Sequence, residues 1–78
     1  MPRTARPRVN GHAVQALRTA RGLTGKNLAA AANISPSYLS DIESGRRRGN
    51  EKIAAALATA LLVPAAALLT LDGLETAA

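Results

Sequence analysis

Residues 24–45 read TGKNLAAAANISPSYLSDIESG, and this stretch decides the fold. Thr24 is a suitable N-cap for a short run with apolar residues on one helical face, and Asn33 stands where a left-handed residue would end that run. Pro36 suits the first position of a second helix, and Gly45 closes it. The stretch therefore predicts two helices joined by a turn of three residues, over residues 25–32 and 36–44.

Three further helices are predicted around this pair. Asn10 can cap a helix that Gly22 ends, and Asn50 can cap another that Pro64 ends, with apolar residues at helical spacing in both. The same spacing predicts a fifth helix over residues 65–71. We find no strand pattern and no repeat, so the expected fold is all-α, a compact domain of five short helices.

Length and composition indicate one domain. The chain has 78 residues, too few for a deep multilayer core. Residues 1–9 contain two prolines and three arginines without periodicity, which predicts a flexible basic arm. Residues 10–72 then form the helical domain, and residues 73–78 a short tail.

The positive charge is unevenly distributed. Residues 1–48 hold nine Lys and Arg against two acids, whereas residues 49–78 hold one Lys against three acids, for a net charge of +5. A basic front with an apolar rear is typical of a polyanion-binding face backed by a packing surface. Charge that merely keeps the protein in solution is the alternative.

Several functions lack the residues that they need. The chain has no Cys and a single histidine, His12, so neither a metal site nor a cofactor is expected. Asp41 and Glu43 lie two apart on one helix and point in different directions, which argues against an enzyme. Residues 53–71 are uncharged but interrupted by Pro64, and no apolar signal segment follows the first arginines. A cytoplasmic location is expected.

The chain resembles the Xre-type helix-turn-helix domains, which include the repressor and Cro proteins of lambda-like phages. The resemblance covers about residues 13–69 and implies a lambda-repressor-like DNA-binding domain that reads the major groove with residues 36–44. The anchors that carry it are Leu17-Arg18, Arg21-Gly22-Leu23-Thr24, Leu28-Ala29, Ile34-Ser35, Tyr38-Leu39-Ser40, Ile42-Glu43, Gly45-Arg46-Arg47, and Leu57-Ala58 with Leu61.

The resemblance also implies roles for individual residues. Arg18 and Glu43 should form a structural ion pair between the first and third helices. The expected base-reading residues are Pro36, Ser37, Tyr38, Ser40 and Asp41. Asp41 could accept from a cytosine amino group, and Tyr38 could press on a thymine methyl or bond a phosphate. The alternatives are a helix-start role for Ser37, a solvated charge for Asp41 and packing on the second helix for Tyr38. Where better-known members often have a glutamine or another long amide, this chain has Gly25 and Pro36, so direct readout should be sparse.

Phosphate contacts require only positive charge or free amides near the groove. One expected set lies at the start of the second helix and another in the loop after the third: Thr24, Gly25, Lys26 and Asn27, then Arg46, Arg47 and Arg48. The arm arginines Arg3, Arg6 and Arg8 are candidates for a minor groove. A solvated loop and a plain disordered arm are the respective alternatives.

The sequence thus predicts a sequence-specific regulator of transcription that binds double-stranded DNA, with a small repressor of the phage immunity or Cro type as first choice. A protein-interaction module, an antitoxin and a controller-type regulator on the same scaffold remain alternatives. A homodimer through the C-terminal helix is one expected assembly and a monomer the other. Its contact residues would be Leu68, Leu69, Leu71 and Leu74.

Overall fold

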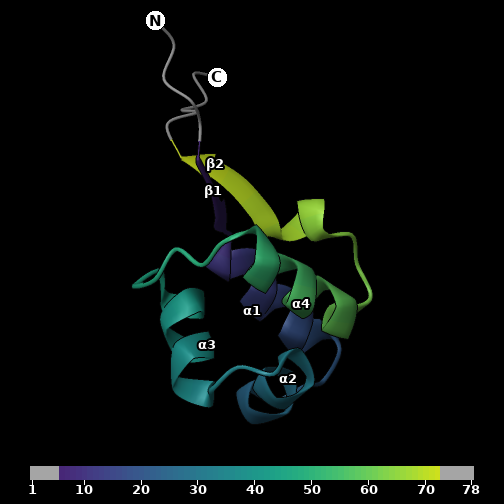
Figure 1. The fold of residues 1–78 in the computed structure, drawn as a ribbon. Helices are drawn as coiled ribbons and strands as arrows, with labels where there is room; N and C mark the ends of the chain where they lie inside the picture. Colours follow the sequence, from purple (N-terminus) through teal and green to yellow (C-terminus); the bar gives the residue numbers. More distant parts are fainter. Residues whose placement is uncertain (1–5, 73–78) are drawn as a thin grey trace, which may run out of the picture.

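The computed structural model describes the backbone of residues 6–72 and the side chains of residues 7–70. Four α-helices surround one apolar core, and two short strands pair beside it (Figure 1). The elements in chain order are β1 (Arg6–Val9), α1 (Gly11–Ala20), α2 (Gly25–Ala32), α3 (Pro36–Ser44), α4 (Glu51–Leu61), the 3-10 turn η1 (Ala65–Leu68) and β2 (Leu69–Asp72).

Each α-helix begins at a side-chain cap. In all four, the cap oxygen accepts a hydrogen bond from the backbone N–H three residues later, at 2.9 to 3.2 Å. Such a bond satisfies one of the amides that a helix start leaves without an internal partner. These contacts confirm the predicted starts of the four helices, at Asn10, Thr24, Ser35 and Asn50.

Small residues let α2 pack closely on α4. Ala29 and Ala32 of α2 and Ala54 and Ala58 of α4 are all buried. Large apolar side chains from every layer fill the rest of the core, each contributing about 1.5–3 kcal/mol by its burial. They are Val9, Val14, Leu28, Leu39, Ile42, Leu57, Leu61 and Leu68. The core therefore fixes α2 and α3 relative to the other elements.

The predicted fifth helix over residues 65–71 is wrong. Ala65–Leu68 make a single 3-10 turn, and the chain then straightens at Leu69 (φ −108°, ψ 143°) into strand β2. Leu68 is fully buried, so the turn still delivers an apolar side chain to the core. Pairing with β1 is favoured because it satisfies backbone groups that a short helix after Pro64 would leave free at both ends.

The predicted flexible arm over residues 1–9 is wrong for its last four residues, which form β1. This strand pairs antiparallel with β2, Arg6 opposite Asp72 and Val9 opposite Leu69. The Val9 N–H also donates to the Arg48 carbonyl at 2.7 Å, and the Val9 side chain is only 2% exposed. The strand is therefore an integral part of the fold, while residues 1–5 lie outside the described residues.

The C-terminal helix that was expected to form a dimer contact is replaced by the turn η1 and the strand β2. Leu68 packs inside the core, and Leu69 is half-buried in β2. The side chain of Leu71, all of Leu74 and the expected tail over residues 73–78 lie outside the described residues. Within residues 6–72, no helix has the length and the apolar character that crossing a bilayer requires.

Candidate nucleic-acid interface

Helices α2 and α3 are joined by three residues in a fixed conformation. Asn33 adopts the left-handed conformation (φ 62°, ψ 42°), which turns the chain sharply. The Ile34 N–H then donates to the Ala29 carbonyl at 2.9 Å, and Ser35 caps α3. Because the turn and the core constrain both helices, α3 is held in a fixed position with its first residues at the surface.

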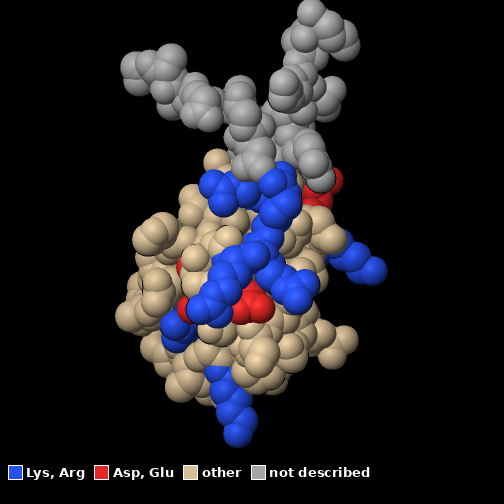
Figure 2. Space-filling model, turned by 90° about the vertical axis from the view of Figure 1, so that its left-hand side faces the viewer, with Lys and Arg blue, Asp and Glu red and all other residues tan. Residues whose placement is uncertain are grey.

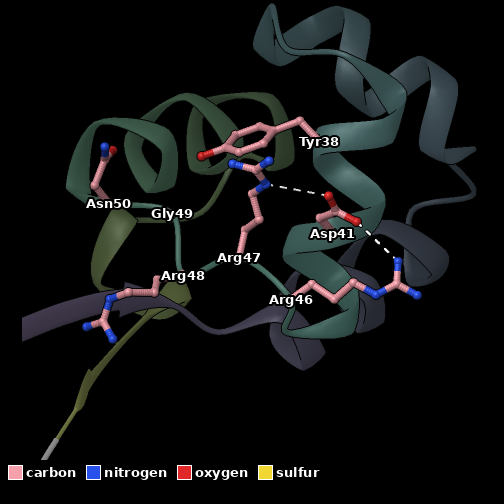
Figure 3. A pocket seen from close by; sticks show the side chains of 7 residues that line it. All are labelled: Tyr38, Asp41, Arg46, Arg47, Arg48, Gly49 and Asn50. Carbon is pink, nitrogen blue, oxygen red and sulfur yellow. Dashed lines mark hydrogen bonds and ion pairs between the residues drawn. The ribbon is translucent and has the colours of Figure 1, made fainter.

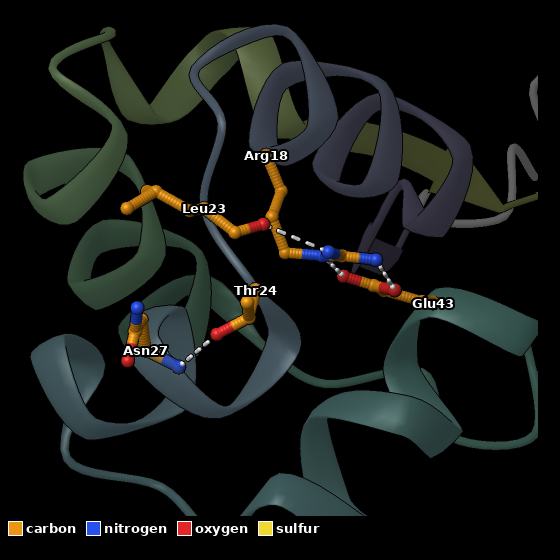
Figure 4. Close-up of polar contacts among 5 residues, drawn as sticks. All are labelled: Arg18, Leu23, Thr24, Asn27 and Glu43. Atoms are coloured by element: carbon orange, nitrogen blue, oxygen red, sulfur yellow. Dashed lines mark hydrogen bonds and ion pairs between the residues drawn. The ribbon is translucent and has the colours of Figure 1, made fainter.

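An ion pair ties α1 to the end of α3 (Figure 4). Two nitrogens of the Arg18 guanidinium donate to the two Glu43 carboxylate oxygens at 2.7 and 3.1 Å, and a third donates to the Leu23 carbonyl at 2.9 Å. The side chains are only 18% and 11% exposed. The hydrogen bond to Glu43 raises the pKa of Arg18, against the opposing effect of burial. The pair therefore fixes the angle of α3, and it keeps the Glu43 charge from standing unpaired beside DNA.

One face of α3 is exposed, beginning with its first two residues. Pro36, Ser37 and Ser40 are all exposed, and the Ser35 hydroxyl accepts from the Tyr38 N–H. Tyr38 is half-buried because its ring packs against the core. Of the residues expected to read bases, the two serines and the proline therefore present open side chains, whereas Tyr38 presents one edge.

Asp41 lies further along α3, and its carboxylate is paired with two arginines of the following loop (Figure 3). Its carboxylate contacts Arg46 Nη1 at 3.3 Å and Arg47 Nε at 3.5 Å. The Arg47 guanidinium also lies over the Tyr38 ring, 5.7 Å from the centroid. The carboxylate expected to accept from a cytosine thus binds two arginines of its own chain in this structure.

Beside this cluster the surface is hollowed. An open depression of about 560 Å³ lies between the end of α3 and the start of α4. Arg47 points across it toward Tyr38, whereas Arg48 points away from Asp41 (Figure 3). The depression is lined by Tyr38, Asp41, Arg46, Arg47, Arg48, Gly49 and Asn50. Most of these groups are polar or positively charged, which suits an anion.

Gly49 and Asn50 were not among the residues expected at the interface. Gly49 has φ 66°, and a Cβ there would lie 2.6 Å from Val9 Cγ2, so glycine lets the loop lie against β1. Asn50 is exposed at the start of α4, where its side chain caps the helix. The sequence places Gly49 in the basic loop after three arginines and Asn50 at the next helix start, and neither position by itself indicates a contact with DNA.

The start of α2 offers a second anion-binding group. Thr24 Oγ1 accepts from the Asn27 N–H at 3.0 Å (Figure 4), and Lys26 and Asn27 are exposed. No atom lies within 4 Å of the position that a Cβ on Gly25 would take, so the backbone is open to approach there. Free amides at a helix start favour a negative charge.

Positive side chains gather on the face made by α3 and the loop after it. Figure 2 shows them as a stripe that runs from the strands across this face, with acidic atoms enclosed in it. Arg8 and Arg48 are half-buried, and the Arg48 carbonyl holds β1. The side chain of Arg6 and all of Arg3 lie outside the described residues. Of the expected minor-groove arginines, only Arg8 therefore has a described side chain, and it is part of a strand.

A family model described as a helix-turn-helix domain matches residues 11–71. A search of curated proteins found no match. The chain is similar to the solved structure of the clp gene regulator ClgR from C. glutamicum, with 36% identity, a TM-score of 0.69, and coverage of 72% of this chain and 73% of that chain.

Two further solved structures share the fold. The restriction-modification controller protein C.AhdI from Aeromonas hydrophila has 33% identity and a TM-score of 0.71, over 73% of this chain and 86% of that chain. SinR, described as a master regulator for biofilm formation and solved in complex with DNA, has 24% identity and a TM-score of 0.68, over 73% of this chain and 95% of that chain. At that identity, the likeness to SinR shows the fold alone.

Proposed function

The chain belongs to the Xre-type family of helix-turn-helix DNA-binding transcriptional regulators, and on this premise we propose that it is a sequence-specific regulator that places α3 in the major groove of double-stranded DNA. One observation carries the proposal. The start of α3 is exposed, a basic loop follows its end and sends Arg47 back to the Tyr38 ring, and the Arg18–Glu43 pair and the core hold the helix at a fixed angle. A rigid helix with open polar side chains can be inserted into a groove without losing the contacts that position it.

The proposed interface combines contacts to base edges with contacts to phosphates. Ser37 and Ser40 present hydroxyls that can contact either groove-edge type, and Pro36 and the edge of Tyr38 offer apolar contacts to a thymine methyl. Phosphates are bound on both sides of α3, by residues 24–27 at the start of α2 and by residues 46–48 after α3. Arg8 adds charge from β1, toward the strand end of the face. With so few base contacts, sequence-dependent DNA shape supplies part of the specificity.

Our first choice for the regulatory outcome is repression. Repression requires only that a DNA-binding domain occupies a promoter, and the family that the chain resembles includes phage immunity repressors and Cro proteins. A controller of a restriction-modification system is the second candidate, and the 33% identity to C.AhdI favours it. Genome-wide binding of the tagged chain in its host separates the two, because a controller binds upstream of restriction-modification genes.

In vitro selection from a random duplex library at near-physiological salt tests the proposal. Enrichment of two inverted half-sites about one helical turn apart supports a dimer on DNA. Enrichment of one asymmetric site supports a monomer. A promoter that carries the enriched site should lose reporter output when the chain is expressed, and a gain would indicate an activator.

Absence of any enriched sequence, with binding that disappears as salt rises, contradicts the proposal. It would favour a protein-interaction module on the same scaffold. The observation behind that alternative is that neither Gly25 nor Pro36 carries a side chain able to donate a hydrogen bond.

A further inference from the structure

Asp41 stands where neither helix stability nor DNA binding favours a carboxylate. It lies within the last four residues of α3, where the helix dipole disfavours negative charge. Its side chain is 28% exposed, outside the apolar core, and it shares a face with residues that we expect to approach phosphates. A role in contact with its neighbours must therefore account for its presence.

Those neighbours are two arginines that Asp41 holds through both backbone and side chain. The N–H groups of Arg46 and Arg47 donate to the Asp41 carbonyl at 2.9 and 3.2 Å, which anchors the start of the loop. The carboxylate then contacts one guanidinium with each oxygen, and Arg47 is kept over the Tyr38 ring (Figure 3). We call Asp41, Arg46, Arg47 and Tyr38 the arginine clamp.

The clamp is weak enough to open. The side chains of Arg46 and Arg47 are 73% and 62% exposed, and ion pairs at such exposure are easily exchanged. A DNA phosphate reaching the loop would meet the same guanidinium groups that Asp41 holds. A phosphate at the loop would therefore compete with the Asp41 carboxylate for two arginines.

Resting on the proposed function, we propose that Asp41 is a specificity-determining positioning residue that competes with DNA phosphates for Arg46 and Arg47. On DNA without the correct sequence, the arginines stay with Asp41, and the loop contributes little. On the correct sequence, contacts of α3 hold the duplex in place long enough for the arginines to transfer to phosphates. Asp41 thus suppresses binding to wrong DNA more than binding to the right site.

The test compares Asp41→Asn with Glu51→Gln, a control that removes the same charge. Glu51 is exposed at the start of α4 and directly follows Asn50, which lines the depression. The dissociation constants of both variants and the parent are measured, at several salt concentrations, on a random-sequence duplex and on the duplex enriched by selection. For Asp41→Asn we expect about 3- to 10-fold tighter binding of the random duplex, and a salt slope steeper by about 1 to 2 because up to two arginines are released. The enriched duplex should gain less than half as much.

A measurement without DNA tests the clamp itself. Tyr38 is the only aromatic residue of the chain, so its ring NMR signals and its fluorescence report on Arg47 directly. Asp41→Asn should shift the ring signals, because the guanidinium is no longer held, while Glu51→Gln should leave them in place. Circular dichroism shows whether each variant is folded.

Two results overturn the proposal. One is an unchanged Tyr38 ring together with unchanged binding of the random duplex in Asp41→Asn. The other is an equal gain on both duplexes that Glu51→Gln reproduces, since this would be a general charge effect. A library that yields no enriched sequence instead overturns the proposed function, and with it the specificity of Asp41. The Tyr38 signals and the random duplex still report on the clamp in that case.

Discussion

At the scale of single residues, the two acids of α3 show why charge alone misleads. Both Asp41 and Glu43 would repel phosphates as free carboxylates, yet each is paired with arginine in the structure. The pair of Glu43 is largely shielded from water, so it acts on the position of a helix. The pairs of Asp41 are open to water, so they can be exchanged for another anion.

Replacing Arg18 by Met should destabilise the fold, because it leaves Glu43 partly buried without its partner. We expect a loss of about 2 kcal/mol, below the value for a fully buried pair because of the remaining exposure. Arg21→Met is the matched control at an exposed position and should change stability by less than about 0.5 kcal/mol. Urea unfolding followed by circular dichroism measures both.

The pH dependence of the stability that Arg18 contributes follows from the direction in which its pKa is shifted. A raised pKa of Arg18 means that the folded state holds the proton more tightly. The contribution of Arg18 is therefore present below the pKa of a free arginine and is lost only as pH rises through the higher pKa of the folded state. The difference between Arg18→Met and the parent should therefore not shrink between neutral pH and pH 10 on account of this arginine. If Arg18→Met is as stable as Arg21→Met, the pair does not position α3.

Leu62 combines a left-handed backbone conformation with an apolar side chain exposed to water. It ends α4 in the left-handed conformation (φ 62°), and its side chain is 79% exposed. Leu62→Gly should raise stability by about 0.5–1 kcal/mol, because glycine adopts this conformation without steric cost. Leu62→Ala is the control, since alanine removes the exposed side chain but keeps the strained backbone, and it should not raise the melting temperature. An increase in both variants would mean that the side chain, not the backbone, was the cost.

At the scale of elements, local signals were sufficient for the four α-helices but not for the strands. Caps such as Thr24 and stops such as Asn33 act within one turn, so the sequence around them predicts the helix ends. The pairing of β1 with β2 joins residues 60 to 66 positions apart, and no local pattern predicts it. The apolar residues after Pro64 have helical spacing, and the strand that they enter depends on pairing with the distant β1, which explains the wrong fifth helix.

The approach of α1 to α3 depends on a glycine. A Cβ on Gly11 would overlap the Ile42 carbonyl oxygen and lie 2.8 Å from that of Glu43. Gly11→Ala should therefore cost about 1–3 kcal/mol, because backbone atoms of α3 must shift. Gly25→Ala is the matched control in another first helical turn with open space around it, and it should be neutral or stabilising by up to about 1 kcal/mol. Equal unfolding midpoints for the two variants would show that the close approach is not essential.

The sequence predicts the geometry of some parts of the candidate site better than that of others. The exposed start of α3 follows from a cap and a proline, both of which can be identified in the sequence. The pairing of Asp41 with two arginines cannot be identified in this way. It arises because Gly45, in the left-handed conformation, folds the loop back onto the end of α3. The depression beside it also depends on Gly49 lying against β1, a contact that requires the unpredicted strand.

At the scale of the whole molecule, the positive charge and the polar first turn of α3 should contribute separately to DNA binding. Lys26→Met should weaken binding of the random and the enriched duplex by a similar factor and reduce the salt slope by about 0.9, the value for one phosphate contact. Ser37→Ala should instead change the preference among sequences, by about 1 kcal/mol for the base pair that it contacts. Repeating the selection with each variant measures both effects. A changed consensus for Lys26→Met with an unchanged one for Ser37→Ala would reverse these roles.

The pairing of β1 with β2 also brings the two ends of the described chain together. Arg6 and Asp72 are partners across the ribbon, so the chain enters and leaves the described structure at one point, beyond the strands in Figure 1. A protein whose entry and exit coincide can be inserted into a loop of another chain, or given new ends elsewhere, with little strain on its core. The fold is in this sense modular, and genetic rearrangement could carry it intact from one protein to another.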